Sequence, residues 1–345
     1  MKNYCICELA ALAALTFASC SSESVEDLGG NQASQQVAIG FDGYLGRSAV
    51  DTRGTESTTA TIQGEGVGFG VFGNYTASGS DVSYGSSLFK NQHVTYKTSN
   101  NISKWEYTPV KYWPTAGHID FLAYAPFDKD QELKNNKNLV FTVNSDVIKQ
   151  IDLLWANATN QTKANNSGTN KVKFNFNHAL AKIGYSVKSK ADYDQTTITV
   201  NSIKLVGDLV DENTKAFYTK GTIDLSKADN KANDLWANTD GPKQNFTLLS
   251  SDQTLSTEYK PENYLFVIPQ DFTGTANNLY VVVEYTVTTG NSVITNKVQK
   301  DISKKFLQGK AYMINLIIGL TPIEFEADVN SWTDGEDIGD IELTN

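Results

Sequence analysis

The sequence has few cysteines, and their positions exclude a fold held together by disulfides. Three cysteines occur in 345 residues, at positions 5, 7 and 20. Cys5 and Cys7 lie inside an N-terminal segment with the pattern of an export signal, so the exported chain would carry Cys20 alone. A single cysteine cannot form an internal disulfide, so stability must come from an apolar core.

Long apolar runs and positive charge are also scarce. No apolar stretch reaches the roughly 20 residues that a membrane-spanning helix needs. The formal charge is -10, and neither Lys nor Arg follows Lys310. Because phosphate binding needs a basic footprint, nucleic acid is excluded as a partner.

Signatures of catalysis and of metal binding are missing. The sequence has no nucleophile elbow, H-E-x-x-H motif or paired-carboxylate motif. Its histidines, His93, His118 and His178, are too far apart for a typical zinc site. We therefore expect no enzyme, no catalytic residue, no metal and no cofactor. For His178, which follows the alternating Phe174 and Phe176, we expect a packed or hydrogen-bonded side chain.

Two segments resemble ligand-binding motifs but lack part of the pattern that these motifs need. Gly68–Gly73 satisfies G-x-G-x-x-G, but turn residues follow it where a dinucleotide site needs a helix, so we predict a strand. The acidic segment starting at Asp328 departs from the EF-hand register, because Thr333 and Gly339 stand where Gly and Glu are needed. Weak calcium binding by the acidic tail stays open.

The N-terminus has the pattern of a bacterial lipoprotein precursor. Leu9 to Phe17 is a short apolar run, small residues follow at Ala18-Ser19, and a thiol comes next. We predict a signal peptide over residues 1–19, acylation of Cys20, and a polar linker over residues 20–36. A buried N-terminal helix with a stray cysteine is the alternative.

The rest of the chain has the pattern of a mostly β, all-β protein. Short alternating runs rich in Val, Ile, Tyr and Phe are interrupted by Gly, Asn, Asp and Ser about every ten residues. We place a domain boundary near Ala181, which gives an N-terminal β-sandwich over 37–181 and a C-terminal one over 182–345. The first strand is expected within 37–45.

A loop with two arginines follows this first strand. Arg47 and Arg53 stand among Gly, Ser, Thr and Asp, a composition typical of exposed loops where proteases cut. We predict proteolytic processing at Arg53 in preference to Arg47.

The C-terminal segment 321–345 contains an amphipathic strand. In "PIEFEADVN", Ile323, Phe325, Ala327 and Val329 face one way, and Glu324, Glu326 and Asp328 face the other. Such a strand can complete its own sheet or be donated to a neighbouring molecule, where a groove lined by Lys would favour it. Residues Ile338 to Leu343 are a second candidate.

Several motifs together resemble the fimbrillins of Bacteroidales, the subunits of type V pili. They are the signal ending at Cys20, Thr52-Arg53 ahead of "GFGVFG", "YWP" followed by "IDFLAYAP", "FNFNHALAKIGYSV", and "GKAYMINLIIGLTPIEFEADVNSW". The resemblance covers nearly the whole chain. It implies two transthyretin-like β-sandwich domains in tandem.

The resemblance also implies a mechanism of assembly. The lipid on Cys20 would hold the precursor on the outer membrane, exposed at the surface, until an Arg-specific protease removes the first strand. A strand from another pilus subunit would then fill the open groove, building a fimbrium for adhesion to host surface ligands.

Other roles stay open at this point. The chain could be a stalk, tip or anchor subunit. A surface glycan-binding lipoprotein would instead use Trp105, Tyr112 and Trp113 as stacking faces, although packing in a core is the default for such aromatic residues.

Overall fold

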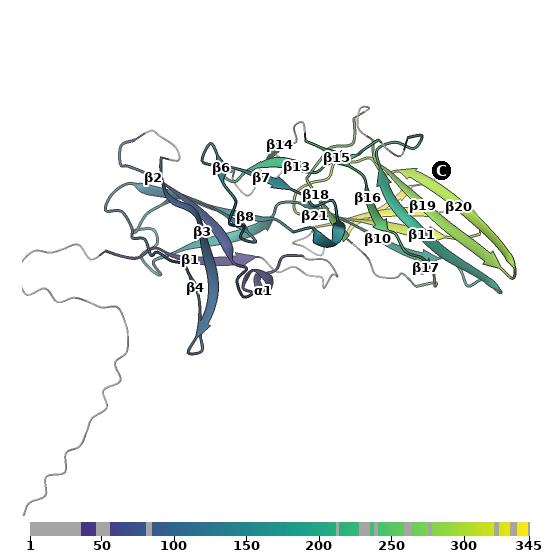
Figure 1. Cartoon of the computed structure of the whole chain (residues 1–345), viewed down its shortest axis with the longest axis horizontal. Coiled ribbons are helices and arrows are strands. Elements are labelled where there is room, and N and C mark those ends of the chain that lie inside the picture. Colours follow the sequence, from purple (N-terminus) through teal and green to yellow (C-terminus); the bar gives the residue numbers. More distant parts are fainter. Residues whose placement is uncertain are drawn as a thin grey trace, which may run out of the picture. The chain divides into compact units, whose positions relative to one another are not determined.

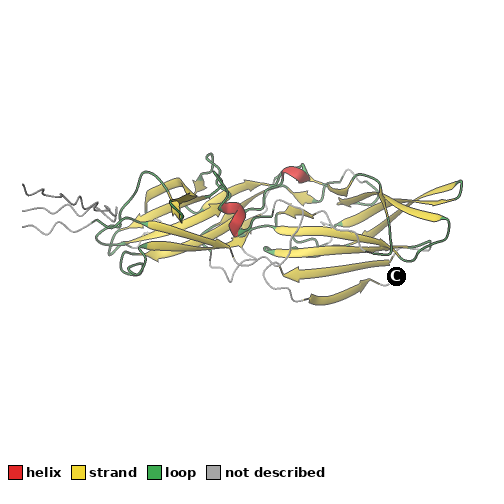
Figure 2. Cartoon of the chain, turned by 90° about the horizontal axis from the view of Figure 1, so that it is seen from below, coloured by secondary structure: helices red, strands yellow, loops and turns green. Residues whose placement is uncertain are grey.

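The computed structural model describes residues 36–45, 56–80, 85–211, 214–227, 235–237, 241–258, 264–274 and 278–320, and the backbone of two strands over 324–331 and 337–343. The chain divides into two units, Met1–Gln36 and Val37–Asn345. Nearly all the described elements are strands, which confirms the predicted all-β class (Figures 1 and 2).

The strands of the first half form a seven-stranded sheet. Its order is β1 (Gly40–Leu45), β9 (Lys171–His178), β8 (Leu154–Gln161), β5 (His118–Ala125), β2 (Phe69–Thr76), β3 (Ser86–Ser99) and β4 (Ile102–Glu106). β2 contains most of "GFGVFG", so the predicted strand is confirmed there. Asn100 and Asn101 have positive φ and close the two-residue β3–β4 hairpin, where the favoured turn requires this backbone conformation.

Two larger sheets follow in the second half. One has the order β18 (Tyr264–Val267), β10 (Ala181–Ser189), β21 (Lys310–Ile318), β22 (Glu324–Ser331) and β23 (Asp337–Leu343). The other has the order β16 (Phe246–Leu249), β11 (Thr196–Val206), β19 (Tyr280–Thr289) and β20 (Ser292–Asp301), and β17 (Gln253–Thr254) also pairs with β11.

Short strands build two small sheets. A four-stranded sheet has the order β14 (Trp236–Ala237), β13 (Lys220–Asp224), β7 (Asn138–Thr142) and β6 (Leu133–Lys134), and β12 (Phe217–Tyr218) pairs with β15 (Lys243–Gln244). β7 and β13 come from opposite sides of Ala181. The predicted boundary there stays a prediction, and hydrogen-bonded strands join the two sides of it.

Two short helices occur in the described part of the chain, α1 (Thr59–Ile62) and the 3-10 helix η1 (Val147–Lys149) (Figure 2). A reciprocal capping box starts α1. The Thr61 backbone N–H donates to Oγ1 of Thr58, and the Thr58 N–H donates to Oγ1 of Thr61. α1 thus begins at Thr59, shortly after the segment 46–55 that contains Arg47 and Arg53.

The buried apolar side chains form two clusters. The first gathers residues of β1, β2, β3, β5, β8 and β9, and is rich in phenylalanine. The second is built mainly from the strands that follow Ala181, with additions such as Phe72, Leu122 and Tyr124. β9 shows how the sequence produces the first cluster: Val172, Phe174 and Phe176 are buried, and the residues between them are exposed or half-buried.

Candidate functional site at the first strand

β1 is an end strand of the seven-stranded sheet and pairs with β9 in parallel. The register runs from Gly40 opposite Lys171 to Leu45 opposite Phe176. Every other pair of neighbouring strands that the structure describes in this sheet is antiparallel. β1 therefore joins the sheet through a long-range contact with a strand more than a hundred residues away.

The backbone ahead of β1 is held on its other side as well. The Ile39 N–H donates to the Lys111 carbonyl at 2.8 Å, and the Trp113 N–H donates to the Val37 carbonyl at 2.9 Å. The hydroxyl of Tyr107 donates to the Ile39 carbonyl at 2.8 Å. The first strand thus lies in a slot between β9 and the segment 107–113.

The inward side chains of the first strand fill an aromatic pocket. Ile39, Phe41 and Leu45 are 2%, 1% and 4% exposed. The Phe41 ring contacts four other rings at centroid distances of 5.3–5.8 Å, those of Phe89, Tyr107, Phe121 and Phe174. Burial of each such side chain contributes about 1.5–3 kcal/mol. Removal of the strand would expose these rings and leave one side of the β9 backbone unpaired.

The outward face of the slot is basic. Lys171 and Lys173 of β9 are exposed and stand in register with Gly40 and Asp42. Opposite charges in facing positions of neighbouring strands attract each other. Asp42 supplies one acidic partner at this face.

After residues 46–55, the segment that contains Arg47 and Arg53, the chain returns to the end of β1. The Thr59 hydroxyl donates to the Leu45 carbonyl at 2.9 Å, and the Leu45 N–H donates to Oγ1 of Thr59 at 3.2 Å. Residues 46–55, with Arg47 and Arg53, lie outside the described part. Both ends of this segment are therefore held at one place, on the strand and on α1.

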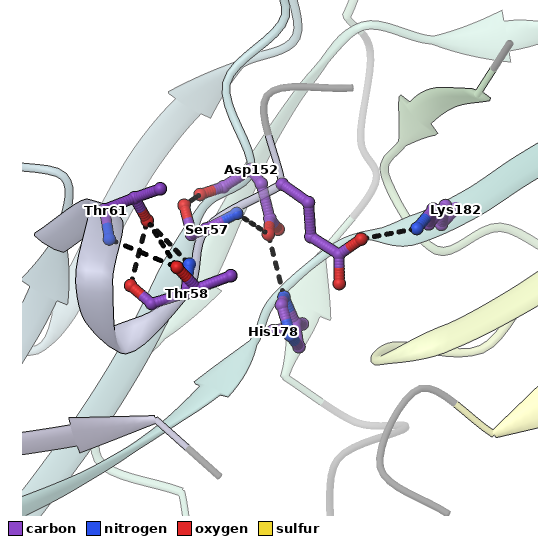
Figure 3. Close-up of polar contacts among 7 residues, drawn as sticks. Ser57, Thr58, Thr61, Asp152, His178 and Lys182 are labelled. Atoms are coloured by element: carbon purple, nitrogen blue, oxygen red, sulfur yellow. Dashed lines mark hydrogen bonds and ion pairs between the residues drawn. The ribbon is translucent and has the colours of Figure 1, made fainter. Parts of the chain in front are cut away.

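A buried polar cluster fixes the chain immediately after residue 55 (Figure 3). Oε2 of Glu56 lies 2.5 Å from Nζ of Lys182 in β10. The Ser57 N–H donates to Oδ2 of Asp152 at 2.9 Å, and its hydroxyl donates to the Asp152 carbonyl at 2.9 Å. His178 is also hydrogen-bonded to Oδ2 of Asp152, at 2.8 Å from Nδ1. We call these five residues the polar anchor.

The geometry of the polar anchor indicates a structural role and not a catalytic one. The Ser57 hydroxyl bonds a backbone carbonyl and not His178, so the two do not form a nucleophile and base pair. Burial raises the pKa of Asp152, because its charged form loses hydration, and the nearby His178 and the Ser57 N–H act in the opposite direction. The expectation that His178 is hydrogen-bonded is confirmed.

Loss of the buried ion pair should destabilise the fold strongly. We expect Lys182→Met to lower the free energy of unfolding by about 3–5 kcal/mol, because it leaves Glu56 buried without this cation. Urea unfolding of the whole chain measures the change. The control is Lys129→Met, which breaks an exposed ion pair with Asp130 and should shift the midpoint little. Similar shifts of the unfolding midpoint for both variants would contradict the stabilising role of the polar anchor.

The other predicted site residues either lie outside the described residues or lie in β22. Cys20 and Ile323 lie outside the described residues. Phe325, Ala327 and Val329 lie in β22, which pairs with β21 of its own chain in the register Leu316–Phe325, Ile314–Ala327 and Tyr312–Val329. β22 and β1 belong to different sheets. In this single chain, β22 completes its own sheet, which is one of the two alternatives that the sequence left open.

The aromatic residues considered as sugar-stacking faces lie mostly in the core. Trp105 and Trp113 are 8% and 6% exposed, and Tyr112 is 47% exposed. Trp105 packs against Phe69 and Tyr96, and Trp113 against Phe121. The default expectation of core packing therefore holds for both tryptophans.

Sequence reasoning missed the polar anchor and the pairing of β1 with β9. Glu56 and Lys182 are separated by 126 positions, and no spacing rule connects them. In the sequence, Glu56 and Ser57 have the pattern of ordinary loop residues. No group of residues suited to hold a metal ion occurs in the part of the chain that the structure describes. Among those residues, no helix is long and apolar enough to cross a membrane.

Comparisons with known proteins give a family and a set of similar folds. A family model described as fimbrillin-like matches residues 52–332. Comparison with curated proteins gave no match. One similar solved structure is a candidate cell adhesion protein from Bacteroides uniformis, with 18% identity, 86% of this chain and 99% of that chain covered, and a TM-score of 0.48.

Two further similar structures come from Porphyromonas gingivalis. The tip fimbrial protein Mfa3, with C-terminal truncation, has 11% identity, covers 79% of this chain and 96% of its own, and has a TM-score of 0.40. The fimbrial anchor protein Mfa2 has 11% identity, covers 87% of this chain and 99% of its own, and has a TM-score of 0.38. Because the family model spans most of the sequence, the chain belongs to the fimbrillin-like family.

Proposed function

We propose that the chain is a structural pilus subunit of a bacterial cell surface, assembled by exchange of its first strand for a strand of a neighbouring subunit. One observation carries the proposal. β1 is a parallel end strand that fills an aromatic slot and is followed directly by the segment with Arg47 and Arg53. A cut in this segment separates β1 from the rest of the chain. Membership of the fimbrillin-like family supports the same role.

The polar anchor would confine the effect of such a cut to the first strand. After cleavage at Arg53 the chain would begin at Gly54, two residues before Glu56. The ion pair with Lys182 and the hydrogen bonds of Ser57 would hold this new end. β1 could then leave while α1 and the strands behind it stay in place.

The N-terminal segment serves export and temporary attachment in this proposal. Cys20 is acylated and holds the precursor on the outer membrane, and cleavage releases the chain from its lipid. More than one acyl chain is needed for firm attachment, as bacterial lipoproteins have. The maturation protease is a partner of the precursor, and other pilus subunits are partners of the product.

The alternatives differ in what they require. A tip subunit needs the slot but no donor strand, and an anchor subunit keeps its lipid. A glycan-binding lipoprotein needs accessible stacking faces, and the burial of Trp105 and Trp113 disfavours it. Among the pilus roles we favour a stalk subunit that both accepts and donates a strand.

Cleavage of the folded chain tests the proposal. We expect an Arg-specific protease to cut at Arg53, or at Arg47, and the cut chain to form polymers on size-exclusion chromatography with light scattering. The physical reason is that an unpaired strand edge and an uncovered aromatic slot strongly favour strand addition. N-terminal sequencing should give Gly54 or Ser48. The double variant Arg47→Ala with Arg53→Ala is the control and should stay monomeric. A cut chain that stays monomeric at all concentrations would contradict the stalk role.

A further inference from the structure

The ion pair of the polar anchor brings an amine and a carboxyl group together away from water. Nζ of Lys182 lies 2.5 Å from Oε2 of Glu56. The two residues are 4% and 8% exposed. Among the ion pairs that lysine makes with carboxylates in the described part of the chain, this one has the least exposed side chains. Because amide formation releases water, a site that excludes water protects an amide from hydrolysis.

Both groups are held by well-fixed parts of the fold. Lys182 lies in β10, which is hydrogen-bonded to β18 on one side and to β21 on the other. Its Nζ also lies 4.3 Å from the centre of the Tyr264 ring. Glu56 precedes Ser57, whose N–H and hydroxyl are both hydrogen-bonded to Asp152. Well-oriented groups within one molecule react as if their concentration were about 10⁵–10⁸ M.

An amide between these side chains would remove two buried charges. Both members of a buried ion pair lose their hydration, and their mutual attraction often fails to offset this loss. An amide is neutral, so its burial costs far less than the burial of an ammonium and a carboxylate. The buried position of the pair therefore favours the product over the reactants.

A second carboxyl group lies near the pair. Asp152 is fully buried, and its Oδ2 is hydrogen-bonded to Ser57 and His178. Its Oδ1 is buried and has no hydrogen-bond partner in the described part of the chain. Burial raises the pKa of Asp152, and the negative charge of Glu56 acts in the same direction, so the two carboxyl groups are close enough to interact. Asp152 is therefore suited to hold and transfer a proton.

We propose that Glu56 and Lys182 are a modification site at which the two side chains condense to an intramolecular amide. In this step a bond forms between Nζ of Lys182 and Cδ of Glu56, and one Cδ–O bond of Glu56 breaks. The leaving oxygen departs as water with two of the three ammonium protons, and Asp152 carries a proton from the nitrogen to that oxygen. The two charges cancel, and no oxidant, reductant or cofactor takes part.

The amide would fix the chain end that the proposed cleavage produces. A cut after Arg53 leaves Gly54 as the first residue, and Glu56, two residues later, would be bonded covalently to β10. The inference goes beyond the proposed function, because the bond forms within one uncut chain and does not depend on the exchange of strands.

Mass spectrometry of the whole chain, folded and then denatured, tests for the bond. We expect the wild type to be lighter by one water molecule than its composition requires. Trypsin does not cleave after an acylated lysine, so the digest should contain Lys182 uncut, in a peptide joined to the one with Glu56. Lys182→Arg is the matched control, because it keeps a cation beside Glu56 and should show the full mass. The two chains share all N-terminal processing, so their mass difference beyond the substitution reports the bond.

Asp152→Asn tests the transfer of the proton. We expect the linked fraction, after equal incubation of folded chains, to fall at least about tenfold. The melting temperature shows whether the variant is folded, and a folded variant that links like the wild type would overturn the role of Asp152. If this variant does not fold, the mass of the wild type still decides whether the bond exists.

The remaining outcomes are distinct. Full mass in the wild type, with cleavage after Lys182, would overturn the inference and leave an ion pair at the site. Loss of water in both the wild type and Lys182→Arg would place the reaction elsewhere and would also overturn it. Cut chains that form no polymer overturn the proposed function alone.

Discussion

Phe325→Asp is expected to reduce the polymer yield of the cut chain by at least about a hundredfold. In the slot this carboxylate would lie among the rings that surround Phe41, and burial of an unpaired charge costs several kcal/mol. Because about 1.4 kcal/mol corresponds to a factor of ten, such a cost suffices for the expected loss. Light scattering of cut wild-type and variant chains at equal concentration measures it.

The melting temperature of the uncut variant separates two causes of this loss. β22 pairs with β21 in the single chain, so Phe325→Asp could also unfold its own sheet. Melting like the wild type together with absent polymer supports donation, whereas outright unfolding supports a purely intramolecular strand. Glu326→Lys changes the outward edge and should have a far smaller effect. Normal polymers from Phe325→Asp would mean that the donor lies elsewhere, for example at Ile338 to Leu343.

Phe41→Ala is expected to destabilise the uncut chain and leave the polymer unchanged. Phe41 is 1% exposed among four rings, so its truncation should lower the free energy of unfolding by about 3–5 kcal/mol. The polymer should be unaffected, because β1 is absent from it. Urea unfolding before and after cleavage measures both effects.

Phe121→Ala is the matched control for this experiment. Phe121 lies in β5, is fully buried, and contacts Phe41 and Phe89. It stays in the chain after cleavage, so its loss should destabilise both the uncut chain and the polymer. A polymer weakened equally by Phe41→Ala and Phe121→Ala would show that β1 remains in the assembled subunit.

Exchange of strands replaces one set of backbone hydrogen bonds by another. β22 now pairs with β21 from Lys310–Ser331 to Ile317–Glu324, and in the slot it would pair with β9 instead. β22 would also give up its pairing with β23, so the backbone bonds alone do not favour the exchange. What favours the exchange after cleavage is the aromatic slot, which has no other cover once β1 has left.

Local patterns predicted the strands well. The alternation of Ile39 and Phe41, and of Val172, Phe174 and Phe176, reports which side chains are buried, because successive residues of a strand face opposite sides. The same rule predicted a strand in "GFGVFG". Each of these predictions needs only residues that are close in the sequence.

Long-range partners could not be predicted in this way. Nothing in the first strand indicates that β9 would be its neighbour, or that the pair would be parallel. The polar anchor could not be predicted for the same reason. Asp152, His178 and Lys182 come together with Glu56 and Ser57 only in the folded chain. The fate of Cys20, Arg47 and Arg53 depends on enzymes of the cell and stays a prediction.

The intact mass of the subunit in polymers from cells tests the central claim most directly. One mass reports both acylation and cleavage. The account predicts a chain that begins at Gly54, or at Ser48, and carries no lipid, so that β1 is absent from the assembled subunit. A polymer subunit that retains Cys20 with its lipid and residues 37–45 would contradict it.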